Sequence, residues 1–296
     1  MSQAWVGTAR FAAGSSRRAQ LRHARLYLVT DDNTRDSDLP GLIAGAVAGG
    51  VDVVQLRRKQ SPPDELRELA VRCLERAHEG GALFLLDDHV DLAREVGADG
   101  VHIGQADLPP ASARSRLGAE LLLGLSTHSK QDVLRAASQP VDYISAGPVH
   151  LTPTKPGRPA VGFEHISVAA ARSSVPVVAI GGLGVESAGK AMAAGADVVA
   201  VVRAICLADD PGEAASELRA AIEAARTWIS LRVNGQQRKA PPGISIEAYL
   251  QLLELPLDGV AVERNGEILR TPELASAPLQ SGDELEVVHL VGGGDD

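Results

Sequence analysis

Residues 51–88 read VDVVQLRRKQSPPDELRELAVRCLERAHEGGALFLLDD. The apolar runs at the two ends of this stretch lack the alternation of a half-exposed strand, as expected for parallel strands that are covered on both faces. The segment between them, residues 63–81, has apolar residues at helical spacing and ends in two glycines, which favours a helix that stops there. The stretch therefore predicts a strand, a helix and a second strand of one parallel sheet.

The same pattern repeats from Arg25 to about Arg226. We expect eight strands, with Ala-rich helical segments between them, at residues 26–31, 51–57, 82–88, 100–105, 120–127, 142–148, 175–182 and 197–205. Eight such units in about 200 residues favour an α/β fold of the (β/α)8 type, a TIM barrel, over an open doubly wound sheet. We assign this barrel to residues 25–227.

The sequence pattern changes after Trp228, and we assign residues 228–296 to a second domain. Its expected strands ISLRVNG and DELEVVHLV alternate between apolar and polar residues, and one convincing helix begins at Ser245. The segment has 5 basic and 11 acidic residues, a net charge of −6 out of −9 for the whole chain. We therefore expect an acidic face that binds a basic partner.

Overall composition excludes several classes of protein. Of the 296 residues 45% are apolar, and 29 basic against 38 acidic residues argue against binding to nucleic acid or to a membrane surface. No apolar run approaches the roughly 18 to 20 residues of a membrane-spanning helix. Cys73 and Cys206 have no CxxC partner, which argues against a disulfide scaffold or a structural zinc site and favours a reducing, cytoplasmic location.

Residues 1–24 stand apart from the barrel pattern. They contain four arginines and no acidic residue, a composition that resembles a transit peptide. Because apolar residues are sparse there and no cleavage pattern is clear, we expect a disordered N-terminal tail instead.

Polar residues follow the predicted barrel strands, where TIM barrels hold their active sites. Gln55, Arg57 and Lys59 alternate at the end of the second strand, so their side chains are expected on one side. Two cations and an amide suit the oxygens of a di- or triphosphate. The alternative is a solvated loop, because Arg58 lies among them.

Carboxylates follow the next two strands. The third strand ends in Asp87 and Asp88, and Asp107 lies at the end of the fourth. Two carboxylates on neighbouring strand ends, close to cations that bind phosphate, favour a Mg²⁺ site. His89 and His102 would permit zinc, but a third clear nitrogen or sulfur ligand is lacking. The alternative is that Asp88 or Asp107 only caps the helix that follows it.

The later strand ends favour a second anion site. The long connection after the sixth strand contains Thr152, Thr154 and Lys155, whose hydroxyls and charge could close over an anionic substrate. Loops after the seventh and eighth strands often bind phosphate through backbone N–H groups, and here these two strands end in Gly181-Gly182 and Val202-Arg203. Ser126 beside His128 invites a nucleophile hypothesis, which we discount because no orienting acid or oxyanion signature is evident.

The barrel resembles thiamine phosphate synthase from about Leu26 to Ala225. The resemblance is carried by QLRRK at residue 55, DDHVDLA at 87, DGVHIGQADLP at 99, GLSTHS at 124, DYISAGPVHLTPTK at 142 and AIGG at 179. It implies a transferase that condenses 4-amino-2-methyl-5-hydroxymethylpyrimidine diphosphate with hydroxyethylthiazole phosphate and releases pyrophosphate.

The resemblance also implies a role for individual residues. The pyrimidine diphosphate would be contacted by Gln55, Arg57, Lys59, Ser126 and Lys155, the Mg²⁺ ion by Asp88 and Asp107, and the thiazole phosphate by Thr152, Thr154, Gly182 and Val202. Arg57, Lys59 and Lys155 together with Mg²⁺ would neutralise the departing pyrophosphate, and no side-chain nucleophile is required. Two residues depart from the family pattern, because Asp87 stands where Asn is usual and Arg203 where Ser is usual. Both are expected to contact substrate.

Residues 229–294 are similar to the small sulfur-carrier protein of thiazole synthesis, which has a ubiquitin-like β-grasp fold. The resemblance implies an adenylating enzyme and thiazole synthase as partners and a thiocarboxylate on a terminal glycine. In this sequence Gly292, Gly293 and Gly294 are followed by Asp295 and Asp296. We therefore expect either that the last residues are trimmed or that the domain serves only for docking.

Two other functions stay open. A barrel related to thiazole tautomerase would bind thiazole phosphate alone and move protons with a histidine such as His128. A non-catalytic assembly protein would use the acidic second domain to recruit an activating enzyme.

Overall fold

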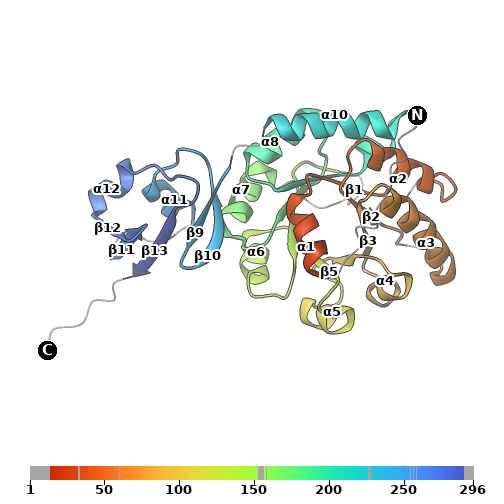
Figure 1. Cartoon of the computed structure of the whole chain (residues 1–296), viewed down its shortest axis with the longest axis horizontal. Helices are drawn as coiled ribbons and strands as arrows, with labels where there is room; N and C mark the ends of the chain where they lie inside the picture. The colour runs from red at the N-terminus through yellow and green to blue at the C-terminus, as the bar shows by residue number, and fades with distance from the viewer. Residues whose placement is uncertain are drawn as a thin grey trace, which may run out of the picture.

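The chain folds into a closed barrel and a smaller mixed sheet beside it (Figure 1). The computed structural model describes residues 14–32, 34–59, 61–152, 157, 159–225, 228–253, 255, 257 and 259–289. No helix among these residues is long and apolar enough to cross a membrane.

The barrel has eight parallel strands that pair in the order of the chain and close where β1 meets β8. They are β1 Leu26–Val29, β2 Val53–Leu56, β3 Leu83–Asp87, β4 Gly100–Ile103, β5 Leu122–Thr127, β6 Tyr143–Ala146, β7 Val177–Ile180 and β8 Val198–Val201. Each lies within one of the eight predicted runs, which confirms the (β/α)8 architecture.

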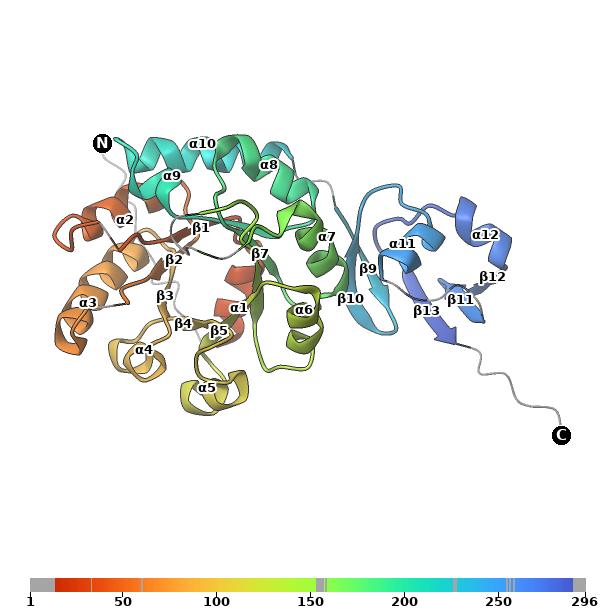
Figure 2. The ribbon, with the colours of Figure 1, turned by 180° about the vertical axis from the view of Figure 1, so that it is seen from behind.

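Helices cover the outside of the barrel (Figure 2). They are α2 Leu39–Ala48, α3 Pro63–Glu79, α4 Val90–Val96, α5 Pro110–Leu117, α6 Lys130–Ala136, α7 Gly162–Arg172, α8 Val185–Ala193, α9 Arg203–Cys206 and α10 Pro211–Ala224. In α3, residues at helical spacing, among them Leu66, Leu69 and Cys73, are buried against the barrel, and the helix ends before Gly80 as the sequence predicts.

Side chains alternate along each strand between the barrel interior and the layer under the helices. On β3, Leu83 and Leu85 belong to the interior cluster, whereas Phe84 and Leu86 pack with the helices. The next position of the interior series is Asp87. Along β3 the side chains of the interior series are therefore apolar until Asp87, at the carboxyl end of the strand.

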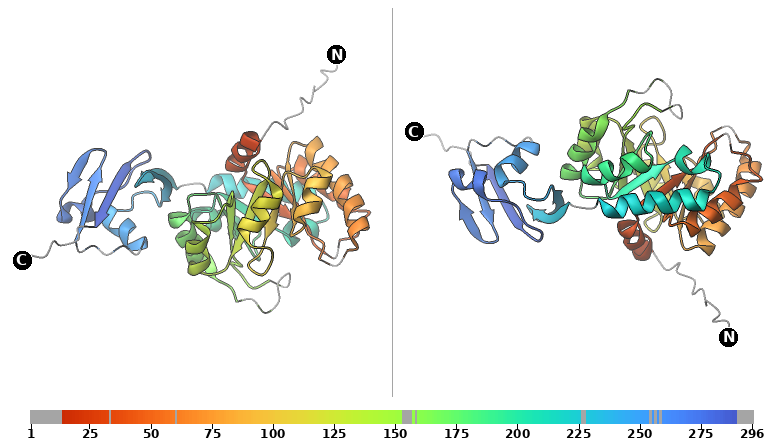
Figure 3. Two further views of the ribbon diagram at one scale, coloured as in Figure 1. Left: turned by 90° about the horizontal axis from the view of Figure 1, so that it is seen from below. Right: turned by 90° about the horizontal axis from the view of Figure 1, so that it is seen from above.

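The amino-terminal segment differs from the expected tail. Helix α1, Gly14–His23, packs against the barrel, with Leu21 buried in the interior cluster. Arg17 Nε lies 2.8 Å from Asp99 Oδ1, the carboxylate oxygen of a residue just before β4. Figure 3 shows α1 at one end of the barrel and the start of the connection after β6 at the other. The prediction of a disordered tail over residues 1–24 is therefore wrong for residues 14–23, which form a helix. Residues 1–13 lie outside the described part of the chain.

The second domain is a mixed sheet of order β10-β9-β13-β11-β12, in which β9 and β13 are parallel and the other neighbours antiparallel. Its elements are β9 Ile229–Val233, β10 Gln236–Ala240, α11 Ile246–Leu252, β11 Val260–Arg264, β12 Glu267–Leu269, α12 Thr271–Ser276 and β13 Glu284–His289. Leu231, Tyr249 and Val262 lie in its core. The β-grasp prediction is confirmed, with α12 as a second helix that we had not predicted.

The two domains are in direct contact. Lys239 of β10 reaches Asp197 just before β8, with 2.7 Å between Nζ and Oδ2, and the Trp228 indole donates to the carbonyl of Ala193 at 2.6 Å. Ala171 of α7 is part of the apolar core of the second domain. The contact lies toward the amino ends of the barrel strands, away from their polar ends.

Candidate active site

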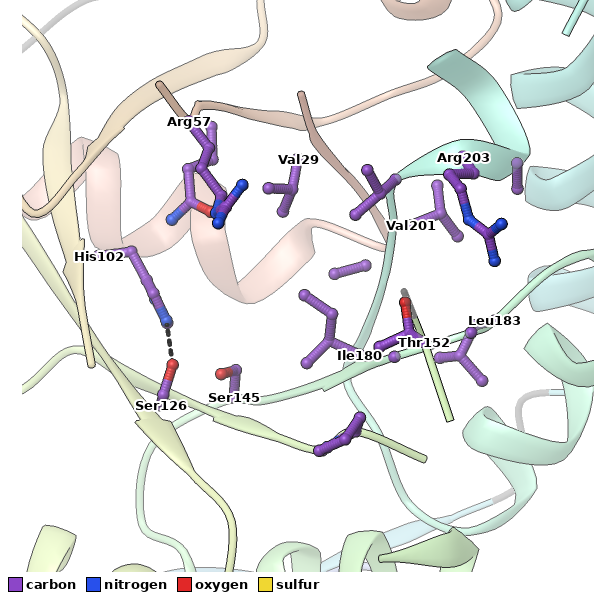
Figure 4. A pocket seen from close by; sticks show the side chains of 18 of the residues that line it. Val29, Arg57, His102, Ser126, Ser145, Thr152, Ile180, Leu183, Val201 and Arg203 are labelled. Carbon is purple, nitrogen blue, oxygen red and sulfur yellow. Dashed lines mark hydrogen bonds between the residues drawn. The ribbon is translucent and has the colours of Figure 1, made fainter. Parts of the chain in front are cut away.

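A cavity of about 180 Å³ opens among the carboxyl ends of the barrel strands (Figure 4). It is lined by residues from most of the strands and the loops after them, which is the usual place for an active site in this fold. The predicted site residues that line it are Gln55, Arg57, Asp87, Ser126, Thr152, Gly182, Val202 and Arg203. The sequence-based site is therefore brought together for the most part in one cavity.

Cations and carboxylates alternate on one side of the cavity. Arg57 forms an ion pair with Asp32, and its Nε lies 3.6 Å from Asp87 Oδ2. Lys59 stands at the rim, with its Nζ 3.1 Å from Asp87 Oδ2 and in an ion pair with Asp88. Partial burial alone would lower the pKa of Lys59, but hydrogen bonds and charge from Asp88 and Asp87 outweigh it and raise that pKa. The ammonium group therefore stays charged.

Arg58 has a different role from its two neighbours, as the alternation of a strand requires. Its side chain is buried behind the cavity, 3.1 Å from Asp36 Oδ1, and it donates to the carbonyl oxygen of Thr34 at 2.6 Å. Arg57 alone of this pair faces the cavity. Arg58 thus holds in place the loop that follows β1.

The carboxylates predicted to bind metal lie beside this cation group, outside the lining of the cavity. Burial is the largest cause that raises the pKa of Asp88, to about 6, followed by the negative charge of Asp87, and a contact with Asp107 adds to the effect. Asp88 Oδ1 has no hydrogen-bond partner among the described residues. Asp107 Oδ2 accepts the N–H of Gly104 at 2.7 Å.

Neither carboxylate caps a helix. The residues before α4 and α5 are His89 and Pro109, and neither helix has a side-chain cap. Among the described residues, no group of three or more His, Cys, Asp and Glu side chains could by itself hold a metal ion. Any ion at Asp88 and Asp107 would need oxygen ligands from a substrate or from water.

Polar groups from four strands meet at the floor of the cavity. His102 Nε2 lies 2.9 Å from Ser126 Oγ, and His102 Nδ1 lies 2.9 Å from the hydroxyl of Tyr143. The side-chain amide nitrogen of Gln55 is buried and has no hydrogen-bond partner among the described residues. An unpartnered buried donor costs free energy unless a ligand or water satisfies it, so this amide is suited to binding substrate.

The opposite wall is made of backbone and small side chains. Gly181 and Gly182 have φ of 108° and 66°, and a Cβ on Gly181 would lie 2.4 Å from Cα of Pro148. Only glycine therefore fits at this close approach. Figure 4 shows Thr152 and Arg203 on this side, away from Arg57 and His102. The cavity thus has two walls of different character.

Two predicted site residues lie outside the described part of the chain, and other residues at the cavity were not predicted. Thr154 and Lys155 lie outside the described residues. The sequence-based set omitted Asp32, Ser145 and the hydrogen bonds of His102 to its neighbours. Ser145 could have been found from strand alternation, because it follows Tyr143 by two positions and both face inward. The hydrogen bonds of His102 could not have been found in this way, since they depend on the register of β4, β5 and β6.

Two known families match the chain. The profile of the family described as thiamine monophosphate synthase matches residues 26–205, and that of the ThiS family matches residues 231–294. The thiamine-phosphate synthase of Gloeobacter violaceus is 43% identical over 201 residues, which are 68% of this chain and 58% of that protein. The thiamine-phosphate synthase of Acidothermus cellulolyticus is 46% identical over 211 residues, 70% of this chain and 99% of that protein.

A solved structure supports the same assignment. The thiamine phosphate pyrophosphorylase from Pyrococcus furiosus superposes with a TM-score of 0.65 at 32% identity. The match covers 69% of this chain and 98% of that structure. The likeness is therefore one of sequence and fold together.

Proposed function

The chain belongs to the thiamine monophosphate synthase family, and from that premise we propose that its barrel joins 4-amino-2-methyl-5-hydroxymethylpyrimidine diphosphate to hydroxyethylthiazole phosphate, with release of pyrophosphate. The observation that carries the proposal is that one cavity is lined both by the cation Arg57, with Lys59 beside it, and by Gln55, whose buried amide nitrogen has no hydrogen-bond partner among the described residues. Arg57 and Lys59 suit a diphosphate, and Gln55 suits the polar edge of a heterocycle.

On the cation side, Arg57 and Lys59 would exchange their carboxylate partners for diphosphate oxygens. Both side chains already stand at the mouth, held by Asp87, so little rearrangement is needed. Their positive charges would stabilise the charge that develops on the departing pyrophosphate. Lys155 is proposed for the same role from its place in the sequence alone.

The residues present fit a Mg²⁺ ion beside the diphosphate. Asp88 offers a carboxylate oxygen without a hydrogen-bond partner among the described residues. Its pKa is raised first by burial and then by the nearby carboxylates, and a bound cation would counter both effects. Asp88 and Asp107 would hold the ion, with phosphate oxygens and water as the remaining ligands. When bound, it supplies positive charge against the leaving pyrophosphate.

The glycine wall is proposed to bind the thiazole phosphate. Gly182 and Val202 line the cavity, and Arg203 adds a positive charge where the family usually has Ser. Thr152 lines the same wall, and Thr154 is assigned there from its sequence position. The thiazole nitrogen would then attack the pyrimidine methylene carbon from this side, and the carbon–oxygen bond to pyrophosphate breaks.

Pyrophosphate release with both substrates and Mg²⁺ tests this function. We expect Asp88→Ala and Asp107→Ala each to lower kcat/KM by about 10²-fold or more, because either change removes a metal ligand. Asp91→Ala is the matched control, since Asp91 is an exposed carboxylate on α4, paired only loosely with Arg116 at 3.5 Å. Unchanged rates in both site variants would remove these carboxylates from the mechanism. Turnover of thiazole phosphate alone without Mg²⁺ would favour the tautomerase alternative.

The second domain belongs to the ThiS family, and we propose that it binds an adenylating enzyme and thiazole synthase. The register of its sheet puts Glu263, Ile268, Glu286 and Val288 on one exposed face. Ile268 and Val288 are exposed apolar side chains between acidic ones, which is the chemistry of a docking surface for a basic partner.

Sulfur transfer would take place at the glycine tail, which lies outside the described residues. Mass spectrometry of the carboxyl end, on protein purified while thiamine is being made, tests the proposal. A chain trimmed to Gly294 and carrying a thiocarboxylate is the expected result. An intact Asp296 under those conditions would leave docking as the role of the domain.

We also propose a cytoplasmic location. Cys73 and Cys206 are both buried free thiols, as is usual in a reducing compartment.

A further inference from the structure

A chain of hydrogen bonds runs from the barrel core to the floor of the cavity. The hydroxyls of Tyr27 and Tyr143 are 3.0 Å apart, Tyr143 lies 2.9 Å from His102 Nδ1, and His102 Nε2 lies 2.9 Å from Ser126 Oγ. These four side chains come from β1, β6, β4 and β5. Figure 4 shows the last link, with Ser126 and His102 at the edge of the cavity.

The two ends of the chain have opposite surroundings. Tyr27 is 2% exposed and is packed among apolar interior side chains, and its hydroxyl has no hydrogen-bond partner other than Tyr143 among the described residues. Ser126, in contrast, lines the cavity, where water or substrate can be reached. A hydroxyl hydrogen without an acceptor therefore costs much free energy at Tyr27 and little at Ser126.

Counting protons decides the direction of the chain. With a neutral imidazole, the four groups carry four polar hydrogens but make only three mutual hydrogen bonds, so one hydrogen is left over. If the bonds run from Ser126 toward Tyr27, the leftover hydrogen is the buried one of Tyr27. If they run from Tyr27 toward Ser126, it is the hydrogen of Ser126, which faces the cavity. A doubly protonated imidazole would also leave a hydrogen in the core, on one of the tyrosines.

We propose that Tyr143 is a positioning residue that donates to His102 Nδ1, holds His102 as the Nε2–H tautomer, and so turns the Ser126 hydroxyl into a donor toward the substrate. The inference rests on the proposed function and deepens it. The pyrimidine group that meets Ser126 must then be a hydrogen-bond acceptor, such as an unprotonated ring nitrogen.

The pKa values of the tyrosines bear on whether the two hydroxyls can donate, and the direction of the chain rests on the hydrogen count and the burial of Tyr27. Burial raises the pKa of both Tyr27 and Tyr143 well above the ordinary value for a phenol. Both hydroxyls therefore keep their protons and remain able to donate.

A glycine makes the chain possible. Gly124 lies between His102 and Tyr143 in the register of β4, β5 and β6. A Cβ there would be 2.1 Å from the Tyr143 ring, so the tyrosine can cross over β5 only because residue 124 has no side chain. The rings of His102 and Tyr143 then stack with centroids 5.5 Å apart.

The direct test is the tautomer of His102, read from the ¹⁵N chemical shifts of the imidazole in the full chain without substrate. We expect a protonated Nε2 and an unprotonated Nδ1. In Tyr143→Phe, Nδ1 loses its donor, so we expect the Nδ1–H form to become populated. Tyr27→Phe is the matched control, because Tyr143 can still donate to His102 and the wild-type tautomer should persist.

Kinetics provide the second measurement. For Tyr143→Phe we expect about a tenfold rise in the KM for the pyrimidine diphosphate, the size of one misdirected hydrogen bond, with the KM for thiazole phosphate within about twofold of wild type. For Tyr27→Phe we expect both KM values to change by less than about threefold.

Two results would overturn the inference. One is an Nδ1–H tautomer in the wild-type protein, and the other is a Tyr143→Phe variant that raises both KM values alike. The tautomer is measured without turnover, so it can fail while the synthase activity holds. Conversely, if the protein made no thiamine phosphate, the ¹⁵N shifts would still show which nitrogen of His102 carries the proton.

Discussion

At the mouth of the cavity, the carboxylate of Asp87 occupies the cations that a diphosphate would need. Its Oδ2 is 3.1 Å from Lys59 Nζ and 3.6 Å from Arg57 Nε. Binding of diphosphate must break these contacts and bring a second negative group close to Asp87.

We therefore expect Asp87→Asn to lower the KM for pyrimidine diphosphate by about three- to tenfold, because removal of one like charge near the ligand is worth about 1 kcal/mol. Initial rates at varied pyrimidine diphosphate and saturating thiazole phosphate measure the effect. Asp91→Asn should change nothing, since that carboxylate is exposed on α4. A higher KM in Asp87→Asn would mean instead that the carboxylate helps to hold the metal ion.

Individual residues differed in how far the sequence could predict them. Gln55 and Arg57 were predictable because a strand places every second side chain on the same side, a rule that needs no partner strand. Tyr143 was not, since its importance comes from the register of β6 with β5 and from a glycine 19 positions earlier in the chain. Sequence periodicity carries no information on such a contact.

At the scale of single elements, helix α1 shows what a local pattern misses. Its sequence, GSSRRAQLRH, has little amphipathic character, and we expected no helix there. The helix is held by contacts distant in sequence, because Leu21 enters the barrel interior and Arg17 pairs with a residue 82 positions later. The eight strands, by contrast, could be predicted from the sequence because each one contains an apolar run of its own.

Asp99, the partner of Arg17, makes the stability of the barrel depend on pH. Burial alone would raise the pKa of Asp99, but hydrogen bonds from His78, Arg17 and the N–H of Phe84 outweigh it and hold that pKa below the ordinary value. A carboxyl group whose pKa is lower in the folded than in the unfolded chain stabilises the fold at pH values above its unfolded pKa, about 3.9, and this stability is lost as the pH falls through the folded pKa.

We expect urea unfolding of the wild type to show falling stability below about pH 4, with part of the fall absent in Asp99→Asn. At pH 7 this variant should be less stable by about 3 kcal/mol, because Arg17 and His78 lose a buried charged partner. Asp91→Asn at the exposed position on α4 serves as the control. Identical pH profiles for wild type and Asp99→Asn would show that this carboxylate does not carry the effect.

At the scale of the whole molecule, the domain contact is the feature that sequence could not reveal. The change of pattern near Trp228 predicted two domains, yet nothing in either sequence pattern showed that Lys239 would meet Asp197 or that Ala171 would complete the second core. Both contacts join the second domain to the barrel on the side of the amino ends of its strands. The carboxyl ends of the barrel strands, where the cavity opens, stay clear of it.

This separation predicts that the domain contact supports stability and not turnover. Lys239 also donates to the carbonyl of Gly195 at 2.7 Å, so Lys239→Ala removes two contacts of a half-buried group and should cost about 1 kcal/mol. Calorimetry should show a lower melting temperature for the transition that includes the second domain, while kcat/KM stays within about twofold. Arg232→Ala is the control, because Arg232 is exposed and pairs at 3.6 Å with Glu284 inside the second domain. If Lys239→Ala instead lowered kcat/KM and left the melting temperature unchanged, the contact would be coupled to the cavity, and the two domains would work as one catalytic unit.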